Sequence, residues 1–167
     1  PVVALISGPS GSGKSTVLET FLEETARADD AVVLAGRCYV RETVPFKGCD
    51  GVLDSLSHWL LGLPPDRAQA LLTPELACAA RLFPAFGRVA RIAADVGTEA
   101  QDAEQVRRTA VAALRDLLRT IAAAGPTVLA IDDFQWGDRD SAMLLEELLA
   151  APDPPGLVLV VAFRSEE

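Results

Sequence analysis

The chain has 167 residues, half of them hydrophobic, and carries a formal net charge of −9. This length fits a single domain with one buried core. The acidic balance argues against a broad surface for nucleic acid or anionic membranes, although a bound nucleotide needs only local positive charge.

The sequence predicts a soluble chain in the cytoplasm. It has neither a run of about 18 apolar residues nor a basic region with a cleavage site that would mark a signal peptide. The cysteines are Cys38, Cys49 and Cys78, and none of them forms a CxxC pair. We therefore expect reduced thiols.

The first motif follows the apolar run 2–6 and reads Gly8-Pro9-Ser10-Gly11-Ser12-Gly13-Lys14-Ser15-Thr16. Gly8, Gly13, Lys14 and Ser15 have the full P-loop spacing. This pattern predicts a strand over 2–7, a phosphate-binding loop, and a helix that ends near Ala28. Backbone N–H groups of such a loop wrap phosphates, and the glycines permit the required conformations. All of residues 8–16 are candidate nucleotide-binding residues.

Three side chains of this loop have predicted roles. We expect Lys14 to reach the β and γ phosphates as a catalytic group, the Ser15 hydroxyl to ligate Mg²⁺, and Thr16 to contact the α phosphate. The helix N-terminus adds its positive dipole end. A plain Gly/Ser turn is the alternative, but such a turn does not need Lys-Ser at this offset.

A second strand is predicted over 31–35, ending at Gly36, and a loop over 37–48 follows it on the edge of the sheet where ligands bind. The charged residues of this loop are interpreted as solvated, with contact to nucleotide or to a neighbouring domain as the alternative. They are Arg37, Arg41, Glu42 and Lys47.

Apolar residues at helical spacing predict a helix over 52–63. His58 is interpreted as an ordinary residue of that helix, because no Cys or Asp partner stands at catalytic spacing. Short helices within 64–100 are interpreted as an insert, and a further helix is predicted over 103–123. We expect three apolar residues of the insert to pack on the sheet, with a partner surface as the alternative: Phe83, Phe86 and Ile92.

The second acidic motif follows the breaker pair Gly125-Pro126 and the apolar run 127–131, and it consists of Asp132 and Asp133. This pattern is typical of a Walker B strand. Asp132 is expected to hold Mg²⁺ through water, and Asp133 to orient or deprotonate the attacking water. The alternative is a pair of acidic residues that merely opens a loop.

A turn follows, and Asp138 or Asp140 is predicted to cap the next helix. The last apolar run, 157–163, predicts another buried strand and ends at Arg164. Arg164 could reach a γ phosphate and report its presence as a catalytic sensor. A solvated strand end is the alternative.

Three blocks together resemble the AAA-type signal-transduction ATPases with numerous domains (STAND): residues 8–16, Leu-Ala-Ile-Asp-Asp-Phe-Gln-Trp-Gly-Asp at 129–138, and Val-Ala-Phe-Arg-Ser-Glu-Glu at 161–167. The chain looks closest to modules attached to bacterial serine/threonine kinases, nucleotide cyclases and helix-turn-helix regulators. The stretch 36–47 also resembles the kinase-linked branch.

The resemblance implies a three-layer α/β/α P-loop NTPase with an ASCE/AAA-like parallel sheet, in which the sensor strand lies between the P-loop and Walker B strands. It also implies a Mg²⁺-dependent ATP/ADP switch that controls effector domains of the same polypeptide or a homo-oligomer. The family's lid, its winged-helix domain and its glycine-arginine motif have no counterpart within 1–167. We therefore expect a segment of a larger protein, incomplete at both ends.

Two other functions stay open at this stage. One is a nucleotide-binding scaffold with little or no turnover, although a second carboxylate at Asp133 favours hydrolysis. The other is a small-molecule kinase, but a kinase would not be expected to end its strand in Asp-Asp. The preference for ATP over GTP depends on the resemblance.

Overall fold

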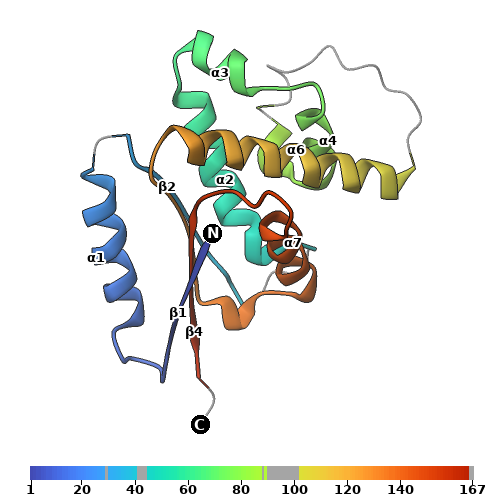
Figure 1. Ribbon diagram of the computed structural model, residues 1–167. Helices are drawn as coiled ribbons and strands as arrows, with labels where there is room; N and C mark the ends of the chain where they lie inside the picture. Colours follow the sequence, from blue (N-terminus) through green and yellow to red (C-terminus); the bar gives the residue numbers. More distant parts are fainter. Residues whose placement is uncertain (29, 41–44, 88, 90–101, 166–167) are drawn as a thin grey trace.

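A computed structural model describes residues 1–28, 30–40, 45–87, 89 and 102–165. Four strands form one sheet in the order β1-β4-β3-β2, and every neighbouring pair is parallel (Figure 1). The strands are β1 (Val2–Gly8), β2 (Val32–Arg37), β3 (Thr127–Asp132) and β4 (Val158–Arg164). The predicted position of the sensor strand, between the P-loop and Walker B strands, is confirmed.

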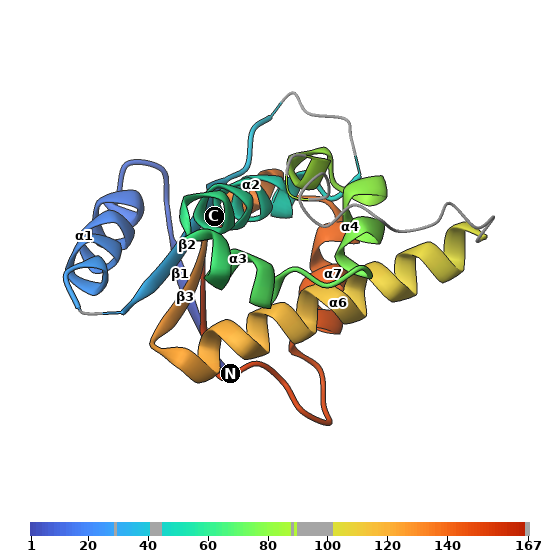
Figure 2. The same cartoon turned by 90° about the horizontal axis from the view of Figure 1, so that it is seen from above.

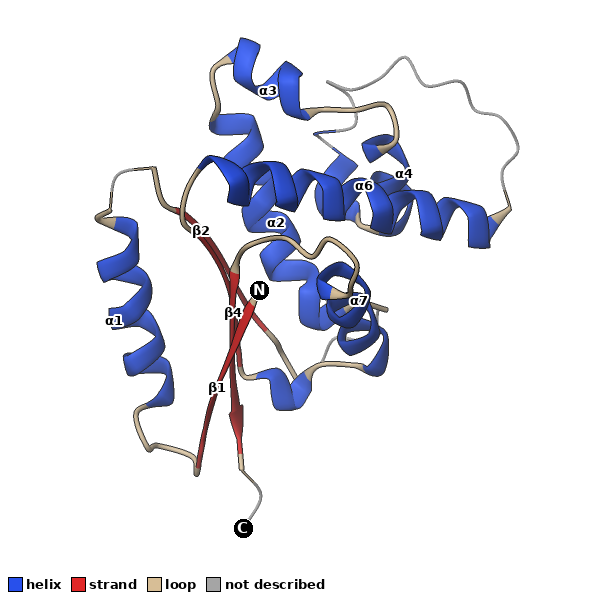
Figure 3. Ribbon diagram, in the orientation of Figure 1, coloured by secondary structure: helices blue, strands red, loops and turns tan. Residues whose placement is uncertain are grey.

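Helices cover both faces of this sheet, as the predicted three-layer α/β/α fold requires. Among the described helices, α1 (Lys14–Ala26) lies alone on one face, and the others lie on the opposite face (Figures 2 and 3). The second group consists of α2 (Lys47–Gly62), α3 (Pro65–Leu71), α4 (Leu76–Leu82), α6 (Ala103–Ala124) and α7 (Arg139–Leu149). None of the helices in the described part of the chain combines the length and apolar character needed to cross a membrane.

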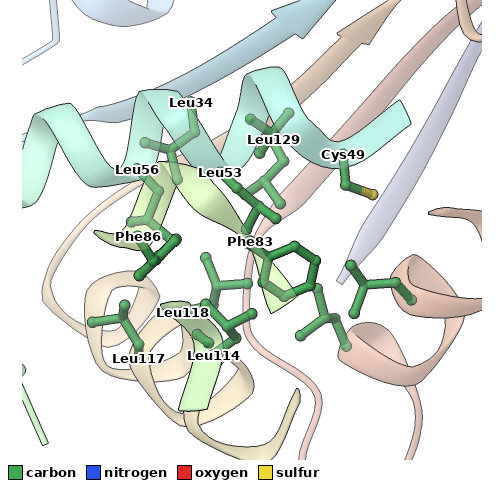
Figure 4. Close-up of a cluster of buried hydrophobic side chains, with 14 of the residues drawn as sticks. Leu34, Cys49, Leu53, Leu56, Phe83, Phe86, Leu114, Leu117, Leu118 and Leu129 are labelled. Carbon is green, nitrogen blue, oxygen red and sulfur yellow. The ribbon is translucent and has the colours of Figure 1, made fainter. Parts of the chain in front are cut away.

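The two faces have separate hydrophobic clusters because strand residues alternate between them. On the α1 side, Leu18 packs with Val128, Ala130 and Val160. The larger cluster lies on the other side and joins β2 and β3 to α2 and α6 (Figure 4). Its buried members include Leu34, Leu53, Leu56, Phe83, Phe86, Leu114, Leu118 and Leu129.

The segment predicted as an insert contributes to this core in its described part. Phe83 and Phe86 are almost fully buried, and the Phe83 ring meets the Phe46 ring edge-on at 5.2 Å between centroids. Their burial agrees with the packing interpretation and leaves neither ring available to a partner. Ile92 lies outside the described residues.

Helix α2 begins at Lys47, five residues earlier than the apolar pattern predicts. The added first turn buries Gly48 and Cys49, so the buried face of the helix begins before Val52. In this part α2 lies close to β2, since a Cβ on Gly51 would lie 2.8 Å from the Gly36 Cα, and glycine at both positions lets the two backbones touch. His58 lies on this helix, as predicted, with its Nδ1 2.9 Å from the Asp54 carbonyl oxygen.

Asp138, and not Asp140, caps α7. Its Oδ1 accepts a hydrogen bond from the Ser141 N–H, and its Oδ2 accepts from the Ser141 hydroxyl, both at 2.8 Å. The Gly48 N–H donates to the same Ser141 oxygen at 2.9 Å and to Asp138 Oδ2 at 3.3 Å. The cap therefore joins the first turn of α2 to the first turn of α7.

Candidate active site at the carboxyl edge of the sheet

The carboxyl ends of the four strands bring the predicted site residues to one edge. The P-loop follows β1, Asp132 and Asp133 end β3 and begin the next turn, and Arg164 ends β4. In the strand register Gly8 is paired with Arg164, and Arg37 is paired with Asp132. The edge thus collects every side chain that the sequence assigned to phosphate, metal or water.

The loop after β1 has the backbone geometry of an anion site. Gly11 and Gly13 have φ angles of +79° and +87°, values that side chains rarely allow. Gly13 is the N-cap of α1 without a side-chain cap, so the first helical N–H groups face the loop. Gly8 itself lies in β1 without a positive φ, and a Cβ there would lie 2.9 Å from the Ser12 hydroxyl. Gly8 therefore does not use the conformational freedom we predicted for it, and the nearest atom to such a Cβ is a hydroxyl that can rotate away.

Lys14 spans the mouth of this loop. Its ammonium group donates hydrogen bonds to the carbonyl oxygens of Gly8 and Pro9, both at 2.8 Å. The positive charge is thus held over the loop that would wrap a phosphate chain. Pro9, Ser10, Ser12 and Thr16 are exposed, so the loop opens to solvent.

Ser15 and Asp132 meet across 117 positions of sequence. The Ser15 hydroxyl donates to Asp132 Oδ2 at 2.8 Å. A hydroxyl and a carboxylate side by side are oxygen ligands of the kind that Mg²⁺ takes in P-loop proteins. The donor set therefore fits the magnesium ion that the sequence predicts at this place.

Asp133 has both carboxylate oxygens engaged. Its Oδ2 accepts from Arg37 Nε at 2.8 Å and from Arg37 Nη2 at 2.6 Å, and its Oδ1 accepts from Gln135 Nε2 at 2.8 Å. Burial alone would raise the pKa of Asp133, but the Gln135 and Arg37 hydrogen bonds and the charges of Arg37 and Arg164 lower it below the usual range. Asp133 is an ionised carboxylate with fixed orientation.

The interpretation of Arg37 as a solvated loop charge holds for its exposure, since its side chain is 52% exposed, but not for its position or its contacts. Arg37 is the last residue of β2, and besides holding Asp133 it lies 3.8 Å from Asp132 Oδ2. The Asp133 hydrogen bond and charge raise the pKa of the Arg37 guanidinium. The sequence does not show that β2 and β3 are neighbours in the sheet. With that pairing known, the end of β2 is the place to look for a cation beside Asp132 and Asp133. Arg41 and Glu42 lie outside the described residues.

Gln135 was not singled out by the sequence. It lies in a short 3₁₀ turn, Phe134–Trp136, and its Oε1 accepts a hydrogen bond from the Arg164 backbone N–H at 3.0 Å. The Arg164 side chain is exposed at the same edge, so its contact with a γ phosphate stays a prediction.

A cavity of about 430 Å³ adjoins Ser15 and Asp132, the candidate magnesium ligands. Ser15, Asp132, Arg37 and Asp54 are among the residues that line it. A ligand at the loop therefore has open space beside the carboxylates.

This sheet, with a glycine-rich loop after its first strand and carboxylates after a neighbouring strand, defines a P-loop NTPase fold. Over residues 1–161 the sequence matches the AAA ATPase domain family, and the chain belongs to that family. Its fold and family are those of proteins that bind nucleotide. None of the curated proteins compared with the chain matches it.

Proposed function

We propose that the protein binds Mg·ATP and Mg·ADP at the carboxyl edge of the sheet and hydrolyses ATP slowly, as a nucleotide-controlled switch in a larger signalling protein. The observation that carries this proposal is the continuous contact from Ser15 through Asp132 to Asp133, because it joins the metal ligands to the carboxylate that would act on water. The AAA family membership supports nucleotide binding.

In this proposal each residue has one task. The amides of residues 8–16 and the Lys14 ammonium bind the phosphates, Ser15 and Asp132 hold Mg²⁺, and Asp133 orients or deprotonates the attacking water. Mg²⁺ supplies charge to neutralise the phosphate oxygens. Arg164 would sense the γ phosphate, and its register with Gly8, the first residue of the P-loop, supports this role.

The test is a calorimetric titration of Mg·ATP and Mg·ADP combined with a turnover assay. Lys14→Ala should lose binding, because it removes the only charge that crosses the loop mouth among the described residues. Asp133→Asn should keep binding and lose turnover by at least about a hundredfold. The controls are Arg27→Ala and Asp153→Asn, two exposed residues away from this edge. Undiminished turnover in Asp133→Asn would rule out its role.

A nucleotide-binding scaffold is the second candidate function, and the Arg37–Asp133 ion pair favours it. A carboxylate that is already neutralised by a guanidinium is a weak acceptor for a proton of water. Saturable binding of both nucleotides without measurable turnover in the unmodified protein would establish the scaffold.

Two further parts of the proposal concern the setting. The switch would act in the cytoplasm, where ATP is present and where buried thiols such as those of Cys38, Cys49 and Cys78 stay reduced. Its partners would be effector domains of the same polypeptide or further copies of this chain. Comparing a longer polypeptide with and without its effector domain, for nucleotide affinity, tests that part.

A further inference from the structure

The short turn after Asp133 connects two parts of the site through one side chain. Gln135 Nε2 donates to Asp133 Oδ1 at 2.8 Å, and Gln135 Oε1 accepts from the Arg164 N–H at 3.0 Å. An ionised carboxylate can only accept, and a backbone N–H can only donate. The two ends of the amide are therefore chemically assigned, and only a residue with both a donor and an acceptor can fill this place.

The Gln135 side chain connects Asp133 with the Arg164 backbone, and both of these residues are linked to the P-loop. Arg164 is in register with Gly8, the first residue of the P-loop, and the Ser165 N–H donates to the Gly8 carbonyl oxygen at 3.3 Å. At the other end, the Asp133 N–H donates to Asp132 Oδ1 at 2.8 Å, and Asp132 in turn contacts Ser15. Gln135 is therefore one link in a series of contacts that runs from Gly8, at the start of the P-loop, to Ser15.

The backbone at Asp133 needs such support. Its φ of +54° places it in the left-handed region, which costs free energy for a residue with a side chain unless surrounding contacts hold it. Gln135 holds the carboxylate with a neutral group, whereas Arg37 holds it with a charge that also neutralises it. The Gln135 contact therefore orients the carboxylate without neutralising it, whereas the Arg37 contact also makes it a weaker acceptor for a proton of water.

This inference rests on the proposed hydrolysis. We propose that Gln135 is a positioning residue, whose side-chain amide fixes the Asp133 carboxylate against the end of β4. It touches neither phosphate nor water itself. It acts through Asp133.

The experiment compares Gln135→Met, Gln135→Glu and the unmodified protein for turnover at saturating Mg·ATP and for nucleotide affinity. Met fills similar volume without either hydrogen bond. Glu can still accept from the Arg164 N–H but repels Asp133. We expect both variants to lower kcat by about tenfold while Kd for Mg·ATP stays within about twofold, since the phosphate contacts are intact. Gln105→Met is the matched control, because Gln105 is exposed on α6 and its side chain hydrogen-bonds only Thr109 and Arg108 among the interactions described.

A double variant distinguishes a purely structural role of Gln135 from the proposed action through Asp133. In an Asp133→Asn background Gln135→Met should cost nothing further, because the carboxylate through which it acts is already gone. Turnover equal to the unmodified protein in Gln135→Met, or an equal loss in both backgrounds, overturns this inference alone. Unmodified protein that binds nucleotide without turnover, or does not bind, overturns the proposed hydrolysis and this inference with it.

Discussion

Asp133 is the residue on which the proposed hydrolysis depends. It is about 15% exposed, stands in a left-handed conformation that Asp and Asn tolerate better than other residues, and has both oxygens held by neighbours from β2 and from its own turn. A free carboxylate on a loop would sample many orientations, whereas this one is restricted to one. Its orientation belongs to the site before any ligand binds.

Arg37 restrains this carboxylate, and its removal gives a prediction. Arg37→Ala leaves Asp133 Oδ2 without its two charged hydrogen bonds, so the oxygen can accept a proton from water more readily. We expect turnover to rise by about threefold or more while nucleotide affinity changes by less than about twofold.

A steady-state assay at saturating Mg·ATP, with Kd from calorimetry, measures both quantities. Arg108→Ala, which removes a guanidinium from the exposed face of α6, is the control. A drop in turnover would mean that Arg37 supports the productive geometry and does not restrain it.

At the scale of elements, the Asp138 cap links two helices. Burial on its own would raise the pKa of Asp138, but hydrogen bonds from the Ser141 N–H and hydroxyl and from the Gly48 N–H lower it. Asp138→Ala removes a helix cap and leaves the Gly48 N–H with one acceptor fewer. We expect a loss of about 2 kcal/mol in the free energy of unfolding, measured by denaturant titration at pH 7.

Asp102→Ala is the matched control, because Asp102 caps α6 through the Gln105 N–H without joining a second helix. It should cost about 1 kcal/mol. Equal losses in the two variants would show that the link between α2 and α7 adds nothing to the cap.

The same cap predicts a dependence on pH. A depressed pKa means that the ionised form stabilises the fold above the ordinary Asp value of 3.8, and that this contribution disappears as the pH falls through and below that value. The difference in unfolding free energy between the unmodified protein and Asp138→Ala should therefore be full at pH 6 and shrink toward pH 3. A difference that stays constant over this range would contradict the charged cap.

Much of the sheet edge could be predicted from the sequence, because its groups have fixed spacing. Gly13, Lys14 and Ser15 stand together in one motif, and Asp132 follows a short apolar run after Gly125-Pro126, a pattern typical of a buried strand. Arg37 and Gln135 could not be found this way. A lone arginine after a glycine looks like a solvated charge, and a lone glutamine has no pattern, until the register places them beside Asp133.

At the scale of the whole molecule, β1 is an edge strand of the described sheet with large apolar side chains in solvent. Val2, Val3 and Leu5 are 61%, 54% and 65% exposed. Unpaired backbone beside apolar side chains favours pairing with another chain. We therefore expect this 167-residue chain to self-associate as its concentration rises, and Leu5→Lys to weaken that association by about tenfold or more.

Sedimentation velocity over a concentration series measures the effect. Leu61→Lys, at a side chain that is 37% exposed on α2, is the control, since it adds the same charge away from the sheet edge. If both variants associate as the unmodified chain does, the β1 edge is not the contact.

The pairing of β1 with β4 also sets an order on biosynthesis. The strand that carries the P-loop has β4 as its neighbour in the described sheet, and more than a hundred residues separate the two. Contacts between distant parts of a chain form late, because the intervening loop must first be closed. On the ribosome, the strand that carries the loop therefore lacks this neighbour until residues 158–164 have emerged, and the edge that holds Lys14, Ser15 and Arg164 cannot form before then.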